Sequence, residues 1–118
     1  MKLGTIIELL SGEALTPVNT DLEIAGACAA SLMSDVLAGV RSGALLLTGL
    51  CSLQVIRTAQ VTDIAAIVFV NGKRPPEDVI AVAREEGLPL LCTPLPTFEA
   101  CGSLYQAGLT ASFCTLRT

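Results

Sequence analysis

The sequence contains no histidine and no tryptophan, and it is poor in charged and aromatic residues. Charged residues make up 15% of its 118 residues and aromatic residues 3%, whereas 52% are hydrophobic. A chain with this much apolar surface can build a core, so we do not expect it to be disordered. Its length suits one compact unit, and we expect a single domain over residues 1–118.

The chain also lacks a long apolar run and an excess of positive charge. Its longest uncharged stretch, residues 100–116, contains polar and glycine positions and falls short of the ~18 apolar residues of a membrane span. No small-residue cleavage site follows the first apolar run, so no signal peptide is expected. A net charge of −4 does not favour nucleic-acid binding. We therefore expect neither a membrane nor a nucleic acid as a partner.

The cysteines form no C-x-x-C pair and are odd in number, and they stand at Cys28, Cys51, Cys92, Cys101 and Cys114. This pattern favours a reduced, cytoplasmic protein over a disulfide-linked scaffold. Their wide spacing and the lack of histidine argue against zinc or iron–sulfur ligation, so we expect no metal and no cofactor. A small, very apolar domain cannot bury all its apolar surface, which predicts self-association, most simply as a homodimer.

From Gly43 onward, a short apolar run, a turn and a segment of helical spacing recur along the chain. This repetition predicts βα units. Because the runs are apolar throughout, both faces of their parallel sheet should be covered by helices. Strands are predicted at residues 44–48, 65–70 and 88–92, and helices at 53–62, 77–86 and 98–107.

The first third of the chain is less regular, and the last ten residues alternate loosely between polar and apolar. We predict helices at 2–10 and 31–39, a turn at 16–20 and a strand at 22–27. Residues 109–118 could form an edge strand or an arm on a partner. The chain as a whole predicts an α/β fold, a three-layer α/β/α sandwich with a mostly parallel sheet of about five strands.

Ligands of open α/β sheets gather at the carboxyl ends of the strands, where helix N-termini offer free N–H groups. In this chain that edge is expected to hold residues 48–52, 71–74 and 93–97, together with 29–31. The candidate ligand-binding residues in these turns are Gly49, Cys51, Ser52, Asn71, Gly72, Lys73, Arg74, Thr93 and Thr97.

The segment 71–74 is the one local cluster of positive charge in the sequence. One interpretation is an anion site, in which Gly72 allows close approach of the backbone and Lys73 and Arg74 bind phosphate. The other is an ordinary turn with solvated cations. The segment lacks the G-x-x-x-x-G-K-[ST] spacing of a phosphate-binding loop.

Two further groups of side chains have both a chemical and a structural interpretation. Cys51 lies at a predicted helix N-terminus, which would lower its thiol pKa, but the chain has no histidine to act as its base, and a small core residue is the alternative. Glu77, Asp78, Glu85 and Glu86 read as solvated helix surface. Asp35 and Asp63 could each cap a helix or hold a turn.

Three segments, residues 44–49, 65–72 and 91–98, resemble a DRTGG domain when read with the helices between them. The residues at matching positions are Gly49, Gly72, Thr93, Pro94, Thr97 and Phe98, whereas Leu50 and Cys51 stand where the family has Asp-Arg. The resemblance covers essentially the whole chain. It implies the fold of the N-terminal domain of HPr kinase/phosphorylase and a regulatory, dimer-forming module rather than an enzyme.

The resemblance and the residues together give three hypotheses of different classes. The first is a non-catalytic, homodimeric regulatory or interaction module whose protein partner belongs to a larger metabolic or redox enzyme system. The second is a sensor that binds a nucleotide or another phosphate-bearing ligand at the carboxyl edge. The third is an enzyme, either thiol-dependent through Cys51 or related to HPr serine kinase, although the chain has no phosphate-binding loop.

Overall fold

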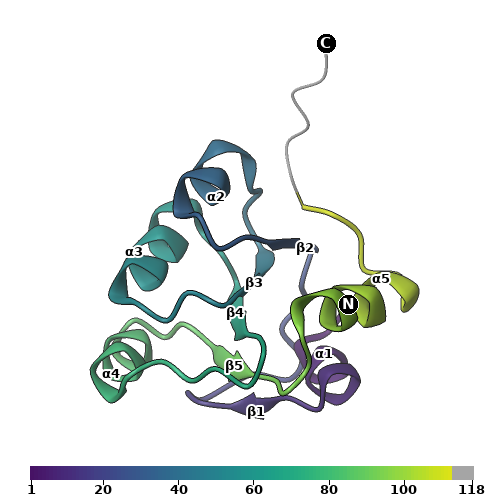
Figure 1. Ribbon diagram of the computed structural model, residues 1–118, viewed down its shortest axis with the longest axis horizontal. Coiled ribbons are helices and arrows are strands. Elements are labelled where there is room, and N and C mark those ends of the chain that lie inside the picture. Colours follow the sequence, from purple (N-terminus) through teal and green to yellow (C-terminus); the bar gives the residue numbers. More distant parts are fainter. Residues whose placement is uncertain (113–118) are drawn as a thin grey trace.

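The computed structural model describes residues 1–112, which form alternating helices and strands (Figure 1). Every helix within this range is too short or too polar to cross a membrane. The elements in chain order are α1 (Leu3–Leu10), β1 (Glu13–Ala14), β2 (Gly26–Ala29), α2 (Met33–Gly39), β3 (Ala44–Thr48), α3 (Leu53–Thr62), β4 (Ala66–Phe69), α4 (Glu77–Glu85), β5 (Leu90–Cys92) and α5 (Thr97–Gln106).

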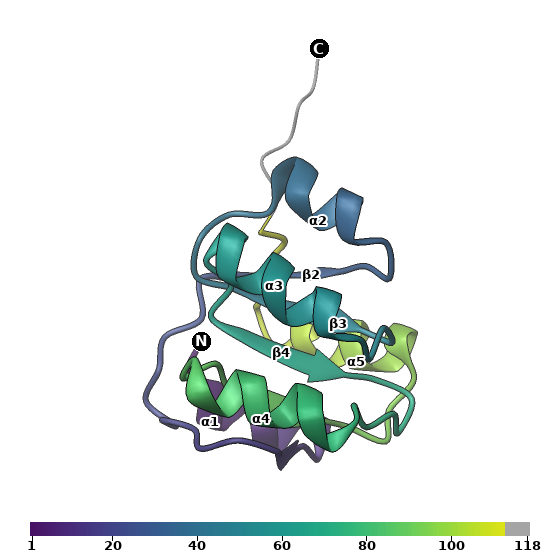
Figure 2. The same cartoon turned by 90° about the vertical axis from the view of Figure 1, so that its left-hand side faces the viewer.

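The strands form one sheet in the order β1-β5-β4-β3-β2. The pairs β2–β3, β3–β4 and β4–β5 are parallel, and β1 runs antiparallel to β5. Helices α2, α3 and α4 cover one face, where Figure 2 shows α3 and α4 lying across β3 and β4, and α1 and α5 cover the other. The predicted three-layer α/β/α sandwich with a mostly parallel five-stranded sheet is therefore confirmed.

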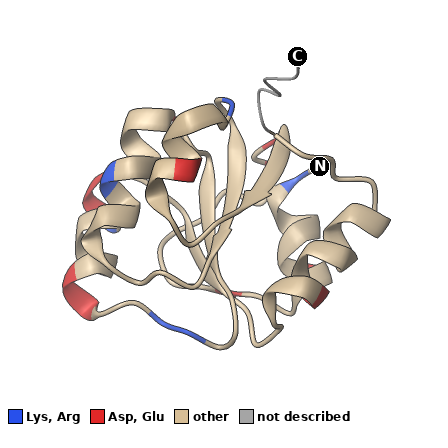
Figure 3. Cartoon of the chain, turned by 45° about the horizontal axis from the view of Figure 1, so that its top comes forward, with Lys and Arg blue, Asp and Glu red and all other residues tan. Residues whose placement is uncertain are grey.

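Side chains of the central strands alternate between two apolar cores, one on each face. All residues of β3 are buried. Leu46 packs in the core beneath α2, α3 and α4, whereas Leu45 and Leu47 pack in the core beneath α1 and α5. Figure 3 shows the charged residues mostly on helices and turns, with the central strands uncharged. The continuous apolar run is thus explained by burial on both faces.

The strand predicted at 22–27 is wrong in its position, because β2 begins at Gly26. Leu22 and Ile24 are apolar, but they pair with the start of the chain instead of entering the sheet. The N–H of Leu3 donates to the carbonyl of Leu22 at 2.8 Å, and the N–H of Ile24 donates to that of Met1 at 2.8 Å. Strand β1 was not predicted, since its two exposed residues carry no apolar signal.

Within the segment predicted at 109–118 as an edge strand or an arm, Ala111 forms an isolated parallel bridge with Ala27 of β2. The N–H of Ala27 donates to the carbonyl of Thr110 at 2.9 Å, and the N–H of Ser112 donates back to Ala27 at 2.9 Å. Glycine is required at position 26, where a Cβ would lie 2.8 Å from that of Ser112. Residues 113–118 lie outside the described part of the chain.

Candidate functional site

Each of the four parallel strands is followed by a helix, so their carboxyl ends meet at one edge of the sheet. A cleft of about 300 Å³ opens at this edge, between the four turns that leave the strands. Its lining residues are Ser31, Gly49, Leu50, Asn71, Lys73 and Thr97. The structure thus places Gly49, Asn71, Lys73 and Thr97 together from among the predicted candidates, and adds Ser31 and Leu50.

The turn after β4 is tied to the turn after β5 by backbone hydrogen bonds. Asn71 and Gly72 have positive φ angles of 62° and 67°. Their N–H groups donate to the carbonyls of Leu95 and Thr93, each at 2.9 Å. These N–H groups are therefore engaged within the protein, and Gly72 does not line the cleft. What this turn offers the cleft is its side chains.

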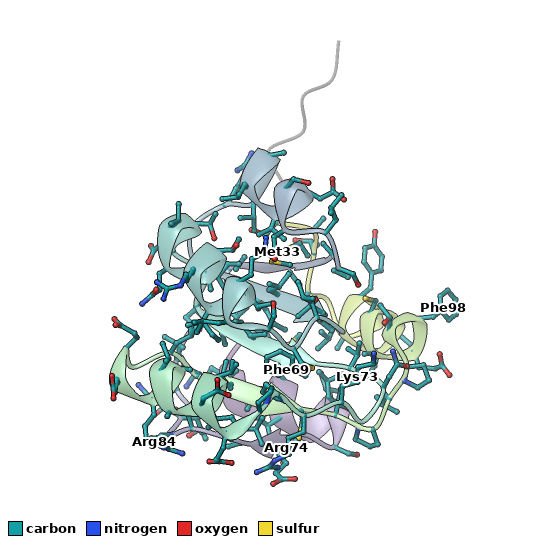
Figure 4. The ribbon with its side chains drawn as sticks, turned by 60° about the vertical axis from the view of Figure 1, so that its left-hand side comes forward. Met33, Phe69, Lys73, Arg74, Arg84 and Phe98 are labelled. Carbon is teal, nitrogen blue, oxygen red and sulfur yellow. The ribbon has the colours of Figure 1, made fainter. Side chains whose placement is uncertain are left out.

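Lys73 and Arg74 are adjacent in sequence, but their side chains point in different directions, as Figure 4 shows. A Cβ at Gly49 would lie 3.8 Å from Cδ of Lys73, so the lysine stem passes over this glycine. Arg74 instead forms an ion pair with Glu13 at 3.2 Å. Of the two cations in the predicted anion site, the structure brings Lys73 to the cleft, whereas Arg74 pairs with a carboxylate of β1 and does not line the cleft.

The polar side chains of the cleft are free to bind a ligand. Within residues 1–112, the hydroxyls of Ser31 and Thr97 and the amide of Asn71 make no hydrogen bond to another residue. Lys73 makes no ion pair in the same range. The lining also contains no carboxylate. The cleft is therefore a positively charged site with unused donors.

Thr93 does not reach the cleft, because it is 1% exposed and its hydroxyl has structural partners. The hydroxyl donates to the carbonyl of Leu10 at 2.5 Å and accepts from the N–H of Leu95 at 3.2 Å. The hydroxyl of Thr48 likewise accepts from the N–H of Leu50 at 3.1 Å. Thr48, at the end of β3, and Thr93, just after β5, thus shape the turns that follow, and the Thr93 hydroxyl is used within the fold and does not line the cleft.

Cys51 and Ser52 precede α3 and do not line the cleft. The half-buried thiol of Cys51 contacts the carbonyl of Gly49 at 3.7 Å. Burial raises the thiol pKa of Cys51, and the charge of Lys73 lowers it by less. The predicted lowering of this pKa at a helix N-terminus is therefore wrong. Ser52 occupies the N-cap position, but its side chain makes no capping hydrogen bond.

The carboxylates outside the cleft have structural positions. Glu77, Asp78, Glu85 and Glu86 are exposed on or beside α4, which confirms that they form solvated surface. Asp63 ends α3 in the left-handed conformation, with a φ of 57°, and its carboxylate accepts a hydrogen bond from the hydroxyl of Ser42. Asp35 is exposed in the first turn of α2, where it makes no side-chain cap.

Comparison with known proteins identifies a solved structure with the same fold. This is the crystal structure of the CBS and DRTGG domains of the regulatory region of Clostridium perfringens pyrophosphatase, complexed with its activator, diadenosine tetraphosphate. The alignment has a TM-score of 0.74 and 16% sequence identity, and it covers 98% of this chain and 51% of that one. The present chain thus spans about half the length of that regulatory region.

No curated protein matches this chain. The family comparison gives a match to the DRTGG domain over residues 5–107, from the first turn of α1 to the end of α5. The match includes the whole sheet and all the turns that line the cleft. The chain therefore belongs to the DRTGG domain family.

Proposed function

We propose that this chain is a non-catalytic regulatory module that senses a nucleotide or another phosphate-bearing ligand at the carboxyl-edge cleft. The observation that carries the proposal is the cleft itself, where, among residues 1–112, Lys73 has no ion pair and lies beside unused hydroxyl and amide groups and no lining carboxylate. A phosphate group is the anion that such donors suit. The structural likeness to a regulatory region supports the same conclusion.

The chemistry around the cleft suits binding without turnover. The polar lining consists of hydroxyls, an amide and an ammonium group. Burial raises the pKa of the neighbouring Cys51 thiol and raises that of Cys28 to about 11. Thiols with raised pKa values stay protonated near neutral pH and are poor nucleophiles. Free thiols also suit a reducing compartment, so we propose a cytoplasmic location. We further propose that the module regulates a larger enzyme.

Replacing Lys73 by glutamine is expected to weaken the binding of adenosine 5′-monophosphate about five- to twentyfold, because one charge-assisted hydrogen bond to the phosphate is lost. Isothermal titration calorimetry at low ionic strength measures this loss. Arg74→Gln is the matched control, since it removes the same charge from the next residue, which is paired with Glu13. An equal loss in both variants would show that only the overall charge matters and would overturn the site.

We propose that the module is a homodimer that associates through the outer flank of α5. Tyr105 is 73% exposed there and lines an apolar hollow of about 130 Å³. The floor of the hollow includes Ala27 and Ala29 of β2, and Cys101 and Leu109 also line it. In residues 1–112, α1 and α5 are the helices of this face, and neither covers β2 (Figure 1). A second copy would bury this apolar surface.

Tyr105→Ser is expected to weaken the dimer at least tenfold, because exposed tyrosines that enter apolar hollows dominate interface energies. Sedimentation equilibrium over a range of protein concentrations measures the shift toward monomer. Val61→Ser is the matched control, since Val61 is 77% exposed on α3, on the opposite face of the sheet. A monomeric wild-type protein at all concentrations would rule out the homodimer, and an unaffected Tyr105→Ser dimer would rule out this face.

A further inference from the structure

Phe98 offers an exposed aromatic surface next in sequence to a residue that lines the cleft. It follows Thr97, a cleft-lining residue, in the first turn of α5, and it is 86% exposed. Figure 4 shows its ring projecting from α5 at the end of the molecule where Lys73 also lies. An exposed ring can stack with the planar base of a nucleotide, and such stacking tolerates any base because every base has a π face.

The charges around the cleft limit how many phosphate groups it can hold. Lys73 is the one cation in its lining. Carboxylates occupy the first turns of three of the four helices that begin at this edge, namely Asp35 in α2, Glu77 and Asp78 in α4, and Glu99 in α5. A single phosphate monoester carries about −1.5 to −2 charges near pH 7. One phosphate therefore already exceeds the positive charge available, and further phosphates would meet carboxylates.

Helix α3 is the exception among these four helices, because its first turn contains no acidic residue. Its preceding turn holds Gly49, over which the Lys73 stem passes. The part of this edge with the fewest negative charges thus lies beside Lys73. The positive end of the α3 dipole makes the electrostatic potential there still more favourable for an anion. This places the one favourable position for a phosphate between Lys73 and the start of α3.

We infer that the ligand is a nucleoside monophosphate, with its phosphate at Lys73 and its base stacked on Phe98. This inference rests on the proposed function, because it specifies the ligand of the same cleft. The cleft volume of about 300 Å³ suits a phosphate and a ribose, and it leaves the base outside the cleft, where the start of α5 exposes Phe98. The free hydroxyls of Ser31 and Thr97 are available to the ribose and phosphate oxygens.

The same charge argument applies to diadenosine tetraphosphate, the activator in the crystal structure of the CBS and DRTGG domains. A chain of four phosphates would bring several negative charges to a cleft whose lining holds one cation, at an edge where three helices begin with carboxylates. The present chain should therefore prefer adenosine 5′-monophosphate to diadenosine tetraphosphate, and most strongly at low ionic strength, where repulsion is least screened.

The test is a calorimetric titration of the full chain with inorganic phosphate, adenosine 5′-monophosphate and diadenosine tetraphosphate. Phe98→Ala is expected to weaken monophosphate binding about five- to thirtyfold while leaving phosphate binding unchanged. Phe98→Tyr should restore the affinity, because the ring is retained. Val61→Ala, which removes an exposed apolar side chain from the last turn of α3, is the control and should leave monophosphate affinity at the wild-type value.

The outcomes separate failure of the inference from failure of the proposed function. Monophosphate and phosphate binding that both respond to Lys73→Gln but not to Phe98→Ala would overturn base stacking and leave the phosphate site intact. Tighter binding of diadenosine tetraphosphate than of the monophosphate would overturn the one-phosphate limit. If none of the three compounds binds, the proposed function fails together with the inference.

Discussion

Replacing Phe69 by alanine is expected to lower the free energy of unfolding by about 3–5 kcal/mol, because the loss of a large buried ring leaves a cavity. Phe69 ends the central strand β4, is 0% exposed and packs against residues from α2, α3 and α4. Urea denaturation followed by far-ultraviolet circular dichroism measures the change. Phe98→Ala is the control: it removes the same ring from an exposed position and should change stability by less than about 0.5 kcal/mol.

A loss of this size is a large part of the about 5–15 kcal/mol that stabilises a typical domain, so the alanine variant can fail to fold. Phe69→Leu keeps most of the apolar volume and is expected to cost about 1–2 kcal/mol, which remains measurable. If both variants matched the wild-type protein, the core under α2, α3 and α4 would not have the packing described above.

Replacing Thr93 by valine is expected to lower the free energy of unfolding by about 2–3 kcal/mol, because two buried backbone groups lose their partner. The Thr93 hydroxyl donates to the carbonyl of Leu10 and accepts from the N–H of Leu95, and so joins α1 to the turn after β5. Valine has nearly the same shape but can neither donate nor accept. Thermal and urea denaturation both report the loss.

Thr97→Val is the matched control for Thr93→Val, since it makes the same change at a threonine four positions along. Thr97 is exposed, lines the cleft and makes no hydrogen bond through its side chain to residues 1–112. Its stability should stay within about 0.5 kcal/mol of the wild-type protein. The opposite ranking, with Thr97→Val the less stable variant, would contradict the assignment of Thr93 to structure and Thr97 to the cleft.

The regular part of the fold could be predicted from the sequence because its strands are buried on both faces. The predicted strand at 44–48 and helix at 53–62 coincide with β3 and α3. These elements show an unbroken apolar run followed by helical spacing, and tertiary packing agrees with both patterns. The edges of the sheet could not be predicted in the same way. Strand β1 has two exposed residues, and the apolar Leu22 and Ile24 pair with the N-terminus.

The location of the cleft follows from topology alone, since consecutive parallel strands bring their carboxyl ends to one edge. The choice of residues within it does not. Thr93 and Thr97 belong to the same predicted turn, but one hydroxyl is buried against Leu10 and the other faces the cleft. Arg74 differs from Lys73 because it forms an ion pair with Glu13, which is distant in sequence. Such differences depend on long-range contacts that local patterns do not record.

The paired backbone hydrogen bonds between the turns after β4 and β5 have a mechanical consequence. Because the backbone N–H groups of Asn71 and Gly72 are hydrogen-bonded to the carbonyls of Leu95 and Thr93, the loop that bears Lys73 is coupled to the segment that leads into α5. Helix α5 also carries Tyr105 on its outer flank. A second copy bound to α5 at the proposed interface would therefore be connected to the proposed anion site through these two hydrogen bonds.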